Sequence, residues 1–561
     1  MTLVPLQAQM QSQLVRALLR LLANLGVNHV VLSPGSRSTP LAQAVAEREH
    51  LGDWPVTVVL DERSAAFVAV GLARAGRLPL VVCTSGSAVA NWLPAVVEAG
   101  ESSLPLIFLS GDRPLQLQNV GAPQTVRQQQ FLASYAAVLH LEVCVPEGMG
   151  QFATIAAELL QYGAQLRARG LPLHINVGLD LPLALQPGPA LPRQPVEITA
   201  VIALQGPPVP PPQPGERVVV IAGPLVPQDP QLLKRLTNSA LLLAEWPSHL
   251  ADGQLRYFDL WLRDPGVRQR TLPDRIVRLG EWPASKGLQL LLDDAAAAQV
   301  PIQVIEPGRT SDPLKGNQLS TPLPPLQATA GWVDAPLPVP LVQAWRSAFH
   351  KIDQRVATQL ALLPGPIERQ LLGCLATAVQ PGAQLVLANS MAIRDADAFC
   401  PQIPKDVHVH VARGANGIDG TLATALGLAL ARGTTWLLLG DGAFLHDIGS
   451  LQLLTQQRAD VRAIVVDNGG GAIFDLLPAA QVIDPQVHQR LFYAPHGLDL
   501  LAIAQGFGLP AQRFGDPAAL LAWLAGDNPG PRLGILAVDR DRSLLHRRAM
   551  QQQVLASLAK T

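Results

Sequence analysis

The sequence predicts an α/β protein of three domains, in which two larger parallel-sheet domains flank a smaller α/β domain. Three observations support this prediction. The chain has 561 residues, which is too long for a single hydrophobic core. Short β-branched runs alternate with amphipathic segments of helical period in two long stretches. Two proline-rich tracts, at residues 205–216 and 320–345, interrupt this alternation and predict linkers.

The first stretch, residues 1–190, is expected to form one of the two outer domains. Its expected strands are HVVLS, VTVVLDE, LPLVVCTSG, PLIFLSGD and LPLHINV. Amphipathic helical segments separate these runs along the chain. Strands that alternate with helices in this way are typical of a parallel sheet covered by helices.

The remaining chain divides into a central and a third domain. Residues 191–345 contain RVVVIAGP, ALLLAEWPS and DRIVRLGEWPASKGLQLLL, which predict a smaller α/β domain. The alternation resumes in residues 346–561 with AQLVLANS, VHVHVARG, TTWLLLGDGA and RAIVVDNGGG. Strands of both outer domains end in small and polar residues, and ligands of open parallel sheets bind beyond the carboxyl ends of strands. We therefore expect the functional groups at these strand ends.

Composition argues against several classes of function. The chain has 42 lysine and arginine residues against 43 aspartate and glutamate residues and no basic tract, so we expect small-molecule partners and no nucleic acid. No apolar run reaches the roughly 20 residues of a membrane span, and the amino terminus lacks the pattern of a secretory signal. The cysteines lack metal-site or redox spacing, which suits a reducing compartment and predicts a cytoplasmic protein. They are Cys83, Cys144, Cys374 and Cys400.

Two strand ends in the third domain predict a metal site. Asp441 lies between Gly440 and Gly442 after an apolar run, and Asn468 follows the next apolar run. The separation fits a strand, a helix and a strand, so a carboxylate and an amide oxygen would lie side by side. Mg²⁺ prefers oxygen ligands and completes its shell with phosphate and water. We expect Asp441, Asn468 and a backbone carbonyl near Gly470 to be its ligands.

The glycines around these ligands would let the backbone approach a diphosphate closely. They are Gly440, Gly442 and the run from Gly469 to Gly471. Either turn alone is better explained as an ordinary turn at a strand end. Because GDG and DNGGG occur together and in this order, we favour a metal-bound diphosphate.

This pair of motifs resembles the cofactor signature of thiamine diphosphate enzymes. The resemblance implies that Asp441, Asn468 and the carbonyl of Gly470 hold Mg²⁺ or Mn²⁺. It also implies a glutamate on the other outer domain that activates the cofactor, and Glu62 in VTVVLDERSAAFVAVG stands at the matching position. From these residues alone, a helix-capping pair is the better explanation of Asp61 and Glu62, but the Asp441 signature reverses that preference.

The same resemblance implies further cofactor contacts from the third domain. Ile418 in ARGANGIDG would support the bent cofactor, although a core position before a helix also explains it. The other implied contacts are Gly440, Gly442, Gly470 and Ile473.

Arginines recur at the polar strand ends of both outer domains. They are Arg37 in SPGSRSTPLA, Arg113 in SGDRP, Arg394 in NSMAIRD and Arg413 in ARGANGIDG. A guanidinium can hold a carboxylate through two parallel charge-assisted hydrogen bonds. A single arginine at a strand end is usually part of a surface ion pair worth about 0–1 kcal/mol. Four at glycine-rich ends predict substrates with more than one carboxylate.

Together with LDER, TSGSAVAN, GDGAFLHDIGSL and NGGGAIFDLLP, these motifs are similar in sequence and order to those of the MenD family. Its members are 2-succinyl-5-enolpyruvyl-6-hydroxy-3-cyclohexene-1-carboxylate synthases of the menaquinone or phylloquinone pathway. The resemblance implies a transferase that decarboxylates 2-oxoglutarate and adds the resulting succinic semialdehyde carbanion to isochorismate in a 1,4 manner. The alternatives are another thiamine diphosphate-dependent 2-oxo acid decarboxylase or carboligase, and a noncatalytic relative.

The resemblance to this family also implies roles for individual residues. It implies catalytic roles for Glu62 and for Gln124 in GAPQTVRQ, although family members often carry asparagine in place of the adjacent Pro123. The implied substrate-binding residues are Ser36, Arg37, Arg113, Lys286, Ser390, Arg394, Arg413, Phe474 and Leu477.

Some of these residues have simpler explanations. Lys286 is otherwise a solvated lysine, and Phe474 and Leu477 are otherwise plain core residues. Glu62 and Asp441 fall in different domains. In this family the cofactor lies between two subunits, so the resemblance implies a homodimer or homotetramer with active sites at the subunit interface.

Overall fold

A computed structural model of the chain describes residues 3–143, 148–189, 191, 206–224, 229–250, 255–306, 313–314, 318–335, 338–399, 406–526 and 529–558. Cys144 and Cys400 lie outside the described residues. The chain forms two compact units. Unit 1 comprises residues 1–203, 414–433 and 446–457, and unit 2 comprises residues 204–413, 434–445 and 458–561.

Unit 1 is built on sheet A, whose six parallel strands have the order β2-β1-β3-β4-β6-β5. The strands are β1 (His29–Leu32), β2 (Val56–Val58), β3 (Pro79–Cys83), β4 (Ile107–Asp112), β5 (Ala137–Glu142) and β6 (Leu173–Gly178). Short 3-10 turns follow β4: η1 (Leu115–Leu117) and η2 (Gln128–Gln130).

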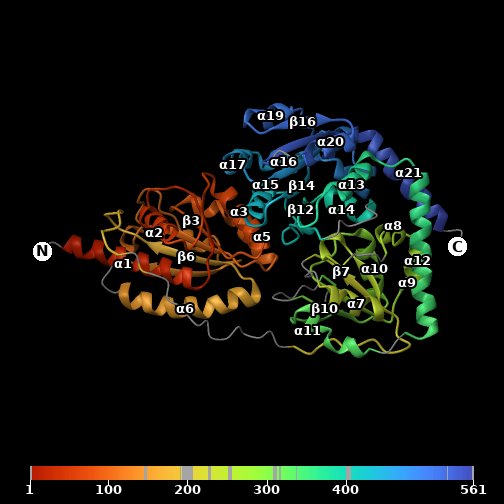
Figure 1. The fold of residues 1–561 in the computed structure, drawn as a ribbon, viewed down its shortest axis with the longest axis horizontal. Helices are drawn as coiled ribbons and strands as arrows, with labels where there is room; N and C mark the ends of the chain where they lie inside the picture. Colours follow the sequence, from red (N-terminus) through yellow and green to blue (C-terminus); the bar gives the residue numbers. More distant parts are fainter. Residues whose placement is uncertain are drawn as a thin grey trace. The chain divides into compact units, whose positions relative to one another are not determined.

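Helices cover both faces of sheet A. Because successive strand residues point to opposite faces, alternate residues pack into two separate layers. One layer is a continuous apolar core with α1 (Leu3–Asn24), α2 (Thr39–His50) and α6 (Gly148–Arg169), and Figure 1 draws α1 and α6 along the sheet. Helix α3 (Glu62–Arg74) packs against β1 and β3. It also contacts α4 (Ser87–Asn91) and α5 (Leu93–Glu101).

Unit 2 contains two further parallel sheets. Sheet B has the order β11-β10-β9-β7-β8, and sheet C has the order β13-β12-β14-β15-β17-β16. The strands of sheet B are β7 (Val218–Ala222), β8 (Leu241–Ala244), β9 (Arg275–Leu279), β10 (Ile302–Ile305) and β11 (Gln318–Thr321). The strands of sheet C are β12 (Gln384–Leu387), β13 (His408–Val411), β14 (Thr435–Gly440), β15 (Val461–Asp467), β16 (Ala511–Phe514) and β17 (Arg532–Ala537).

The helices of unit 2 pack on these two sheets. Those near sheet B are α7 (Pro230–Ser239), α8 (Phe258–Trp261), α9 (Pro265–Thr271), α10 (Lys286–Ala297), α11 (Pro325–Ala328) and α12 (Pro340–Leu362), with the turns η3 (Trp246–Ser248) and η4 (Ala330–Asp334). Those around sheet C are α13 (Ile367–Ala378), α14 (Met391–Phe399), α16 (Asp441–His446), α18 (Pro485–His488), α19 (Leu500–Gly506), α20 (Pro517–Ala525) and α21 (Arg540–Leu558), with the turns η6 (Ala472–Leu476), η7 (Pro478–Gln481) and η8 (Gln489–Tyr493).

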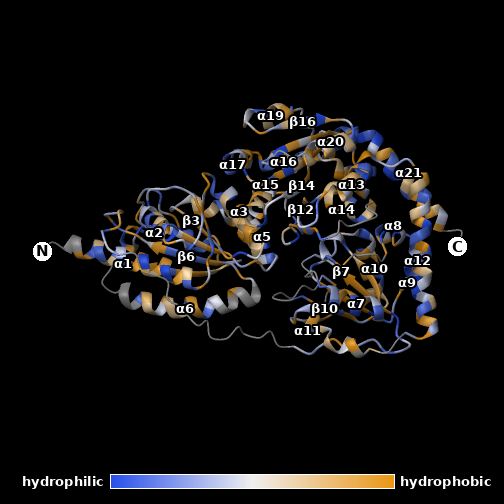
Figure 2. Ribbon diagram, viewed as in Figure 1, coloured by the Kyte–Doolittle hydropathy of each residue, from blue (hydrophilic) through white to orange (hydrophobic). Residues whose placement is uncertain are grey.

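The predicted fold class is confirmed. Numbered from their own first strand, sheets A and C share one order, 2-1-3-4-6-5, so the two outer sheets have the same topology. The fully buried strands of sheet B and sheet C are mainly apolar in Figure 2. The structure adds five strands that the sequence analysis did not identify, namely β5, β10, β11, β16 and β17.

The proline-rich tracts are partly packed against sheet B. Val209 is buried; its backbone N–H donates to Ala328 O at 2.8 Å, and Trp332 Nε1 donates to Val209 O at 3.1 Å. The predicted boundary after residue 190 adjoins residues that the structure does not describe. The predicted boundary after residue 345 falls within α12. Among the described helices, none is both long and apolar enough to cross a membrane.

Two segments that follow strands of sheet C in the chain belong to unit 1. They form α15 (Thr421–Arg432), the turn η5 (Ile448–Ser450) and α17 (Leu451–Gln457). Helix α15 crosses α3 so closely that a Cβ atom added to Gly427 would lie 2.0 Å from Val68 O, and one added to Gly71 would lie 2.1 Å from Thr424 O. Glycine at both positions is therefore a packing requirement of this crossing.

We expect the Gly427→Ala substitution to destabilise unit 1. Alanine favours a helix over glycine by about 1 kcal/mol, but the added methyl group would collide with backbone at the crossing, and overpacking of this kind typically costs about 1–3 kcal/mol. Gly373→Ala in α13 is the matched control, because nothing lies within 4 Å of its added Cβ atom. Thermal unfolding should show a lower Tm for Gly427→Ala and an unchanged or higher Tm for Gly373→Ala. Equal shifts would contradict the crossing.

Candidate active site

Arg113 and Gln124 meet at the carboxyl edge of sheet A. Arg113 follows β4 directly, and its Nη1 donates to Ser85 Oγ and to Gln124 O, the latter at 2.8 Å. Gln124 Nε2 donates in return to Ser85 O at 3.0 Å. Gln124 has a φ of 56°, in the left-handed region that non-glycine residues rarely adopt. These contacts hold a catalytic and a substrate-binding candidate in one loop cluster.

Ser36 and Arg37 lie in the loop after β1, beside the same edge. Arg37 Nη1 donates to Leu179 O, after β6, at 2.7 Å. A Cβ atom added to Gly111 would lie 3.0 Å from Arg37 O, so glycine lets this loop pass over the end of β4. The Thr39 hydroxyl donates to Ser36 O at 2.7 Å and closes the turn before α2. Four of the predicted residues thus lie at one edge of sheet A.

Glu62 is the first residue of α3, and its neighbour Asp61 serves as the helix cap. Asp61 accepts hydrogen bonds from Arg63 N at 2.9 Å and from Ser64 Oγ at 3.2 Å. Glu62 is half-buried, and its Oε2 accepts a hydrogen bond from Asn91 Nδ2 at 3.2 Å. The capping explanation therefore accounts for Asp61 but not for the Glu62 carboxylate.

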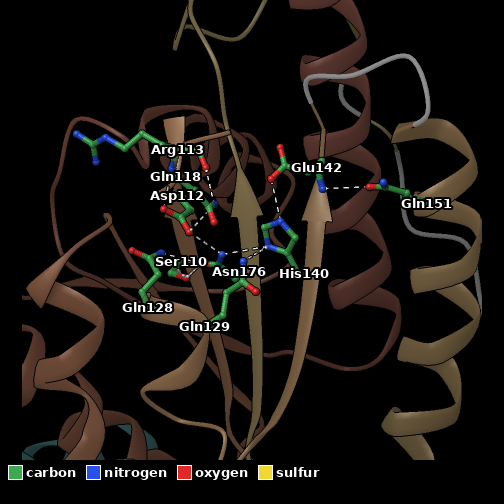
Figure 3. A network of polar contacts seen from close by, with 10 residues as sticks. All are labelled: Ser110, Asp112, Arg113, Gln118, Gln128, Gln129, His140, Glu142, Gln151 and Asn176. Atoms are coloured by element: carbon green, nitrogen blue, oxygen red, sulfur yellow. Dashed lines mark hydrogen bonds and ion pairs between the residues drawn. The ribbon is translucent and has the colours of Figure 1, made fainter. Parts of the chain in front are cut away.

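A buried polar network beneath the Arg113 loop was not identified from the sequence (Figure 3). Its centre is Gln128, which is fully buried. Gln128 Oε1 accepts from Gly86 N at 2.8 Å, and its Nε2 donates to Asn176 Oδ1 at 2.7 Å and to Gly111 O at 3.1 Å. One carboxamide thus ties the loop after β3 to the ends of β4 and β6.

The same network continues to β5 through His140. Its Nδ1 faces two amide donors, Gln129 Nε2 at 3.0 Å and Asn176 Nδ2 at 3.1 Å, so Nδ1 must accept. Nε2 then carries the proton and donates to Glu142 Oε1 at 2.8 Å. Asn176 Nδ2 also lies 2.9 Å from Asp112 Oδ2, and burial raises the pKa of the Asp112 carboxyl group. His140, Glu142 and Asn176 lie in strands and outside the motifs of the sequence analysis.

Two buried acids of unit 1 accept hydrogen bonds from the backbone on either side of Ile418. Glu98 accepts from Ala415 N at 2.8 Å and is paired with Arg74 Nη2 at 2.6 Å. Asp447 accepts from Ala423 N at 3.0 Å, and burial raises its pKa to about 6. Ile418 lies between Ala415 and Ala423 in the sequence and is half-buried.

Asp441 organises the predicted metal site in unit 2. Gly440 pairs with Val466 in the sheet, so Asp441 and Asn468 follow neighbouring strands at one edge. Asp441 Oδ2 accepts from Asn468 N at 3.1 Å and from Gly470 N at 3.0 Å, and its Oδ1 accepts from Gly442 N at 2.6 Å. Burial raises the pKa of Asp441.

The residues present at this site fit a hard divalent cation. Asn468 Oδ1 is buried and has no hydrogen-bond donor among the described residues, as expected for an oxygen that binds a metal ion. Asp441, Asp467 and His496 also bring ligand atoms within 4.8 Å of one another. His496 Nε2 lies 3.6 Å from both carboxylates, and the sequence analysis did not single it out.

The glycines around Asp441 have two different explanations. No described atom lies within 4 Å of a Cβ atom added to Gly440 or Gly442, so these two positions leave the open space that a diphosphate needs. A Cβ atom added to Gly470 would instead lie 2.4 Å from Tyr493 O, and one on Gly471 2.7 Å from Phe492 O. Close packing against the chain at η8 therefore accounts for Gly470 and Gly471.

Arg394, Arg413 and Ser390 form a second cluster in unit 2, after β12 and β13. Arg394 Nη1 donates to Ser390 O at 2.6 Å, and Ser390 has a φ of 71°. Arg413 Nη1 lies 3.4 Å from Asn389 Oδ1. Burial and the positive charge of Arg413 lower the pKa of Arg394, which places the two guanidinium groups close together. Two adjacent half-buried cations favour an anionic ligand.

Lys286 and the apolar candidates are more exposed. Lys286 begins α10 on the side of sheet B and is exposed, next to the buried Ser285. Phe474 and Leu477 are 37% and 45% exposed, so the alternative explanation that they are core residues is wrong. Ile473 is half-buried in η6 beside them.

The predicted site residues are divided between the two units. Unit 1 holds Ser36, Arg37, Glu62, Arg113, Gln124 and Ile418. Unit 2 holds Lys286, Ser390, Arg394, Arg413, Gly440, Asp441, Gly442, Asn468, Gly470, Ile473, Phe474 and Leu477.

Comparison with known proteins identifies the domains that carry most of these residues. Residues 12–131 match the model of the thiamine pyrophosphate enzyme N-terminal TPP binding domain, and residues 398–526 match that of the C-terminal TPP binding domain. The chain is therefore a thiamine diphosphate-dependent enzyme.

Longer matches define the family more narrowly. The chain is 34% identical to 2-succinyl-5-enolpyruvyl-6-hydroxy-3-cyclohexene-1-carboxylate synthase of Myxococcus xanthus, over 97% of both chains. It is 36% identical to the synthase of Kineococcus radiotolerans, over 94% of this chain and 96% of the relative. The synthase of Synechococcus elongatus is 32% identical, over 95% and 94%. The chain belongs to this family of synthases.

We expect Gln128→Met to destabilise unit 1 although methionine has nearly the same volume. The substitution leaves the buried Gly86 N–H without its acceptor and removes a donor from Asn176, and buried unsatisfied groups cost about 1–3 kcal/mol each. Gln116→Met is the control, because exposed Gln116 makes one hydrogen bond of 3.2 Å to Asp180. Denaturant unfolding should show a loss of about 2–3 kcal/mol for Gln128→Met and at most about 0.5 kcal/mol for the control. A similar small loss for both would contradict the network.

Proposed function

We propose that this chain decarboxylates 2-oxoglutarate and joins the remaining four-carbon unit to isochorismate by 1,4-addition. The products are 2-succinyl-5-enolpyruvyl-6-hydroxy-3-cyclohexene-1-carboxylate and carbon dioxide, in menaquinone or phylloquinone biosynthesis. Both substrates are small dicarboxylates. The reaction therefore needs cationic side chains for several carboxylates and a cofactor that stabilises a carbanion.

One observation carries this proposal. All four arginines of the family motifs follow the carboxyl ends of parallel strands, in a chain that matches a named synthase over 97% of its length. Ligands of open parallel sheets bind beyond such ends. A set of four guanidinium groups also matches the four carboxylates of the two substrates together.

The residues of unit 1 would activate the cofactor and bind acidic substrate. When bound, thiamine diphosphate supplies a nucleophilic carbon and accepts the electron pair left by decarboxylation. Glu62 would hold a ring nitrogen of the aminopyrimidine through its carboxyl group. Ser36, Arg37 and Arg113 would bind substrate carboxylates, and Gln124 would present its side chain near the reacting carbon.

The residues of unit 2 would bind the diphosphate and the remaining carboxylates. Asp441, Asn468 and the Gly470 carbonyl would hold Mg²⁺ or Mn²⁺, while Gly440 and Gly442 leave room for the diphosphate. Lys286, Ser390, Arg394 and Arg413 would bind carboxylates. Ile473, together with Ile418 of unit 1, would contact the cofactor, and the exposed Phe474 and Leu477 would form an apolar wall.

The wider organisation is proposed on the same basis. We infer domains at residues 1–190, 191–345 and 346–561, and a homodimer or homotetramer whose active sites combine groups from two subunits. A cytoplasmic location is consistent with Cys83 and Cys374, which form no disulfide bond in the described chain.

A direct assay tests the reaction. The protein is incubated with thiamine diphosphate, Mg²⁺, 2-oxoglutarate and isochorismate, and isochorismate absorbance and product mass are followed. We expect consumption of isochorismate, and a loss of about 10²-fold in kcat/KM for Arg37→Ala because about 1.5–3 kcal/mol of charge-assisted binding is removed. Arg217→Ala is the control, since Arg217 is an exposed ion-pair partner of Asp274 in the central region.

The assay also distinguishes the alternative functions. Turnover of 2-oxoglutarate or pyruvate without isochorismate would indicate another decarboxylase or carboligase. No turnover of any 2-oxo acid in protein that binds the cofactor would indicate a noncatalytic relative.

Mixing two inactive variants tests the shared active site. Glu62→Gln and Asp441→Asn proteins should each lose at least about 10²-fold in kcat. If each site takes Glu62 from one subunit and Asp441 from another, random reassociation restores one site in four, and we expect about a quarter of wild-type activity after the mixed proteins are unfolded and refolded together. Glu49→Gln mixed with wild type is the control for refolding, because Glu49 is exposed on α2. Activity that stays at the level of the separate variants would contradict a site built from two chains.

A further inference from the structure

Two acidic side chains are buried behind the Arg394 and Arg413 cluster of unit 2. Glu245 follows β8 and is fully buried, and Asp397 lies in α14 with 3% of its surface exposed. Neither belongs to the family motifs described above. Carboxyl groups are rarely buried to this degree unless they are paired or protonated.

Each of these carboxyl groups has one oxygen occupied by a backbone donor. Glu245 Oε1 accepts from Ser285 N at 2.7 Å, and Asp397 Oδ1 accepts from Trp246 N at 3.1 Å. The remaining oxygens, Glu245 Oε2 and Asp397 Oδ2, are buried and have no donor among the described residues. The two side chains lie within hydrogen-bonding range of each other. A proton shared between them would satisfy both oxygens.

Three other titratable groups near this acid pair have partners of their own. Asp259 pairs with Arg263 at 2.8 Å, and Asp395 pairs with Arg547 at 2.5 Å. His249 accepts a hydrogen bond from Val409 N through Nε2 at 2.9 Å, so it presents no proton at that atom. Asp259 still acts electrostatically on both acids, Arg413 acts on Glu245, and Glu245 acts on Arg394.

The backbone links this acid pair to the proposed substrate-binding residues. Ser285, which donates to Glu245, immediately precedes Lys286, and Gly287 N donates to Asp259 Oδ1 at 3.1 Å. Asp397 lies one helical turn after Arg394 in α14. Arg413 interacts electrostatically with Glu245. A change in the charge of Glu245 therefore acts on Arg394 and Arg413.

We propose that Glu245 and Asp397 share a proton and, as positioning residues, set how much positive charge Arg394 and Arg413 present to an anionic substrate. This inference rests on the proposed substrate-binding role of the two arginines. Two ionised carboxylates would offset both guanidinium groups and leave no net charge for the substrate. A protonated pair leaves that charge available and keeps its hydrogen bonds.

The direction of the pH dependence follows from the environment of the pair. Burial raises the pKa of Glu245 to about 7 and raises the pKa of Asp397 well above its ordinary value, and the neighbouring Glu245 raises that of Asp397 further. Below pH 7 both groups hold protons. As the pH rises through 7, Glu245 becomes an anion opposite Arg413 while Asp397 keeps the shared proton. Binding of an anionic substrate should therefore weaken from pH 6 to pH 8.5.

Infrared spectroscopy tests the shared proton without any substrate. At pH 8, a carbonyl stretching band of a protonated carboxyl group should appear in the wild-type protein and disappear in Asp397→Asn. Asp353→Asn is the matched control, because Asp353 is also buried but accepts from Tyr257 N at 2.8 Å and Trp261 Nε1 at 3.0 Å, which satisfy a carboxylate. A band that is absent from the wild type, or that survives in Asp397→Asn, overturns the shared proton.

Steady-state kinetics test its effect on the arginines. The KM for 2-oxoglutarate should rise about tenfold from pH 6 to pH 8.5 in the wild type, because one negative charge appears near Arg413. In the Glu245→Gln variant the amide Nε2–H can donate to Asp397, and position 245 can no longer ionise. Its KM should therefore be independent of pH from 6 to 8.5, with kcat following the wild-type pH profile. The Asp353→Asn control should keep the tenfold rise. The same pH dependence in Glu245→Gln and the wild type overturns the proposed tuning.

The two measurements separate this inference from the proposed reaction. The infrared band decides whether the pair holds a proton even if isochorismate is not consumed. If the band is present and the protein turns over a different 2-oxo acid, the proposed reaction is wrong, and the KM for that acid tests the pair in the same way.

Discussion

All strands of a parallel sheet end at the same edge, so the loops there must satisfy their polar groups while leaving the edge open to ligands. In unit 1 this constraint is met by side chains placed beneath the loops. Gln128 accepts a hydrogen bond from Gly86 N and donates to the ends of β4 and β6. The loops therefore need not fold over the edge to satisfy their backbone groups. Arg113 and Gln124 can then remain at the surface of the edge.

Buried acids perform the same task elsewhere in the chain. Glu98 holds the N–H groups of Gly414 and Ala415, and Asp441 holds those of Asn468 and Gly470. Hydrogen bonds to a charged group contribute about 1.5–3 kcal/mol each, about twice a neutral bond. A carboxylate that is kept from water also acts on nearby charges with little screening. The buried acids that hold the loops therefore also act on the charged groups of the candidate sites. Glu245 and Asp397 have both roles, since each accepts a backbone N–H and Glu245 acts on Arg394 and Arg413.

The sequence predicted the sheet class and the loop residues because both leave local signals. Apolar runs marked β1, β3 and β14, and GDG marked Asp441 through its glycines. The strand β5 was missed because it carries the polar His140 and Glu142, which pair with each other, while the amide partners of His140 come from β6 and η2. The pairing of Glu245 with Asp397 was equally hidden, since the two residues are far apart in the chain and neither sits in a motif. Long-range polar contacts are visible only once the strands are placed side by side.

The two outer sheets show that strand order alone does not determine chemistry. Sheets A and C share the order 2-1-3-4-6-5, yet glycines at their edges serve different purposes. Gly35 and Gly111 let loops of sheet A pack against Thr84 and Arg37, which closes the spaces between loops and fixes the arginines. Gly440 and Gly442 of sheet C face open space on both sides of Asp441. One edge is therefore filled by its own side chains, while the other leaves open space beside the proposed metal ligands, because the glycines of the two edges face different surroundings.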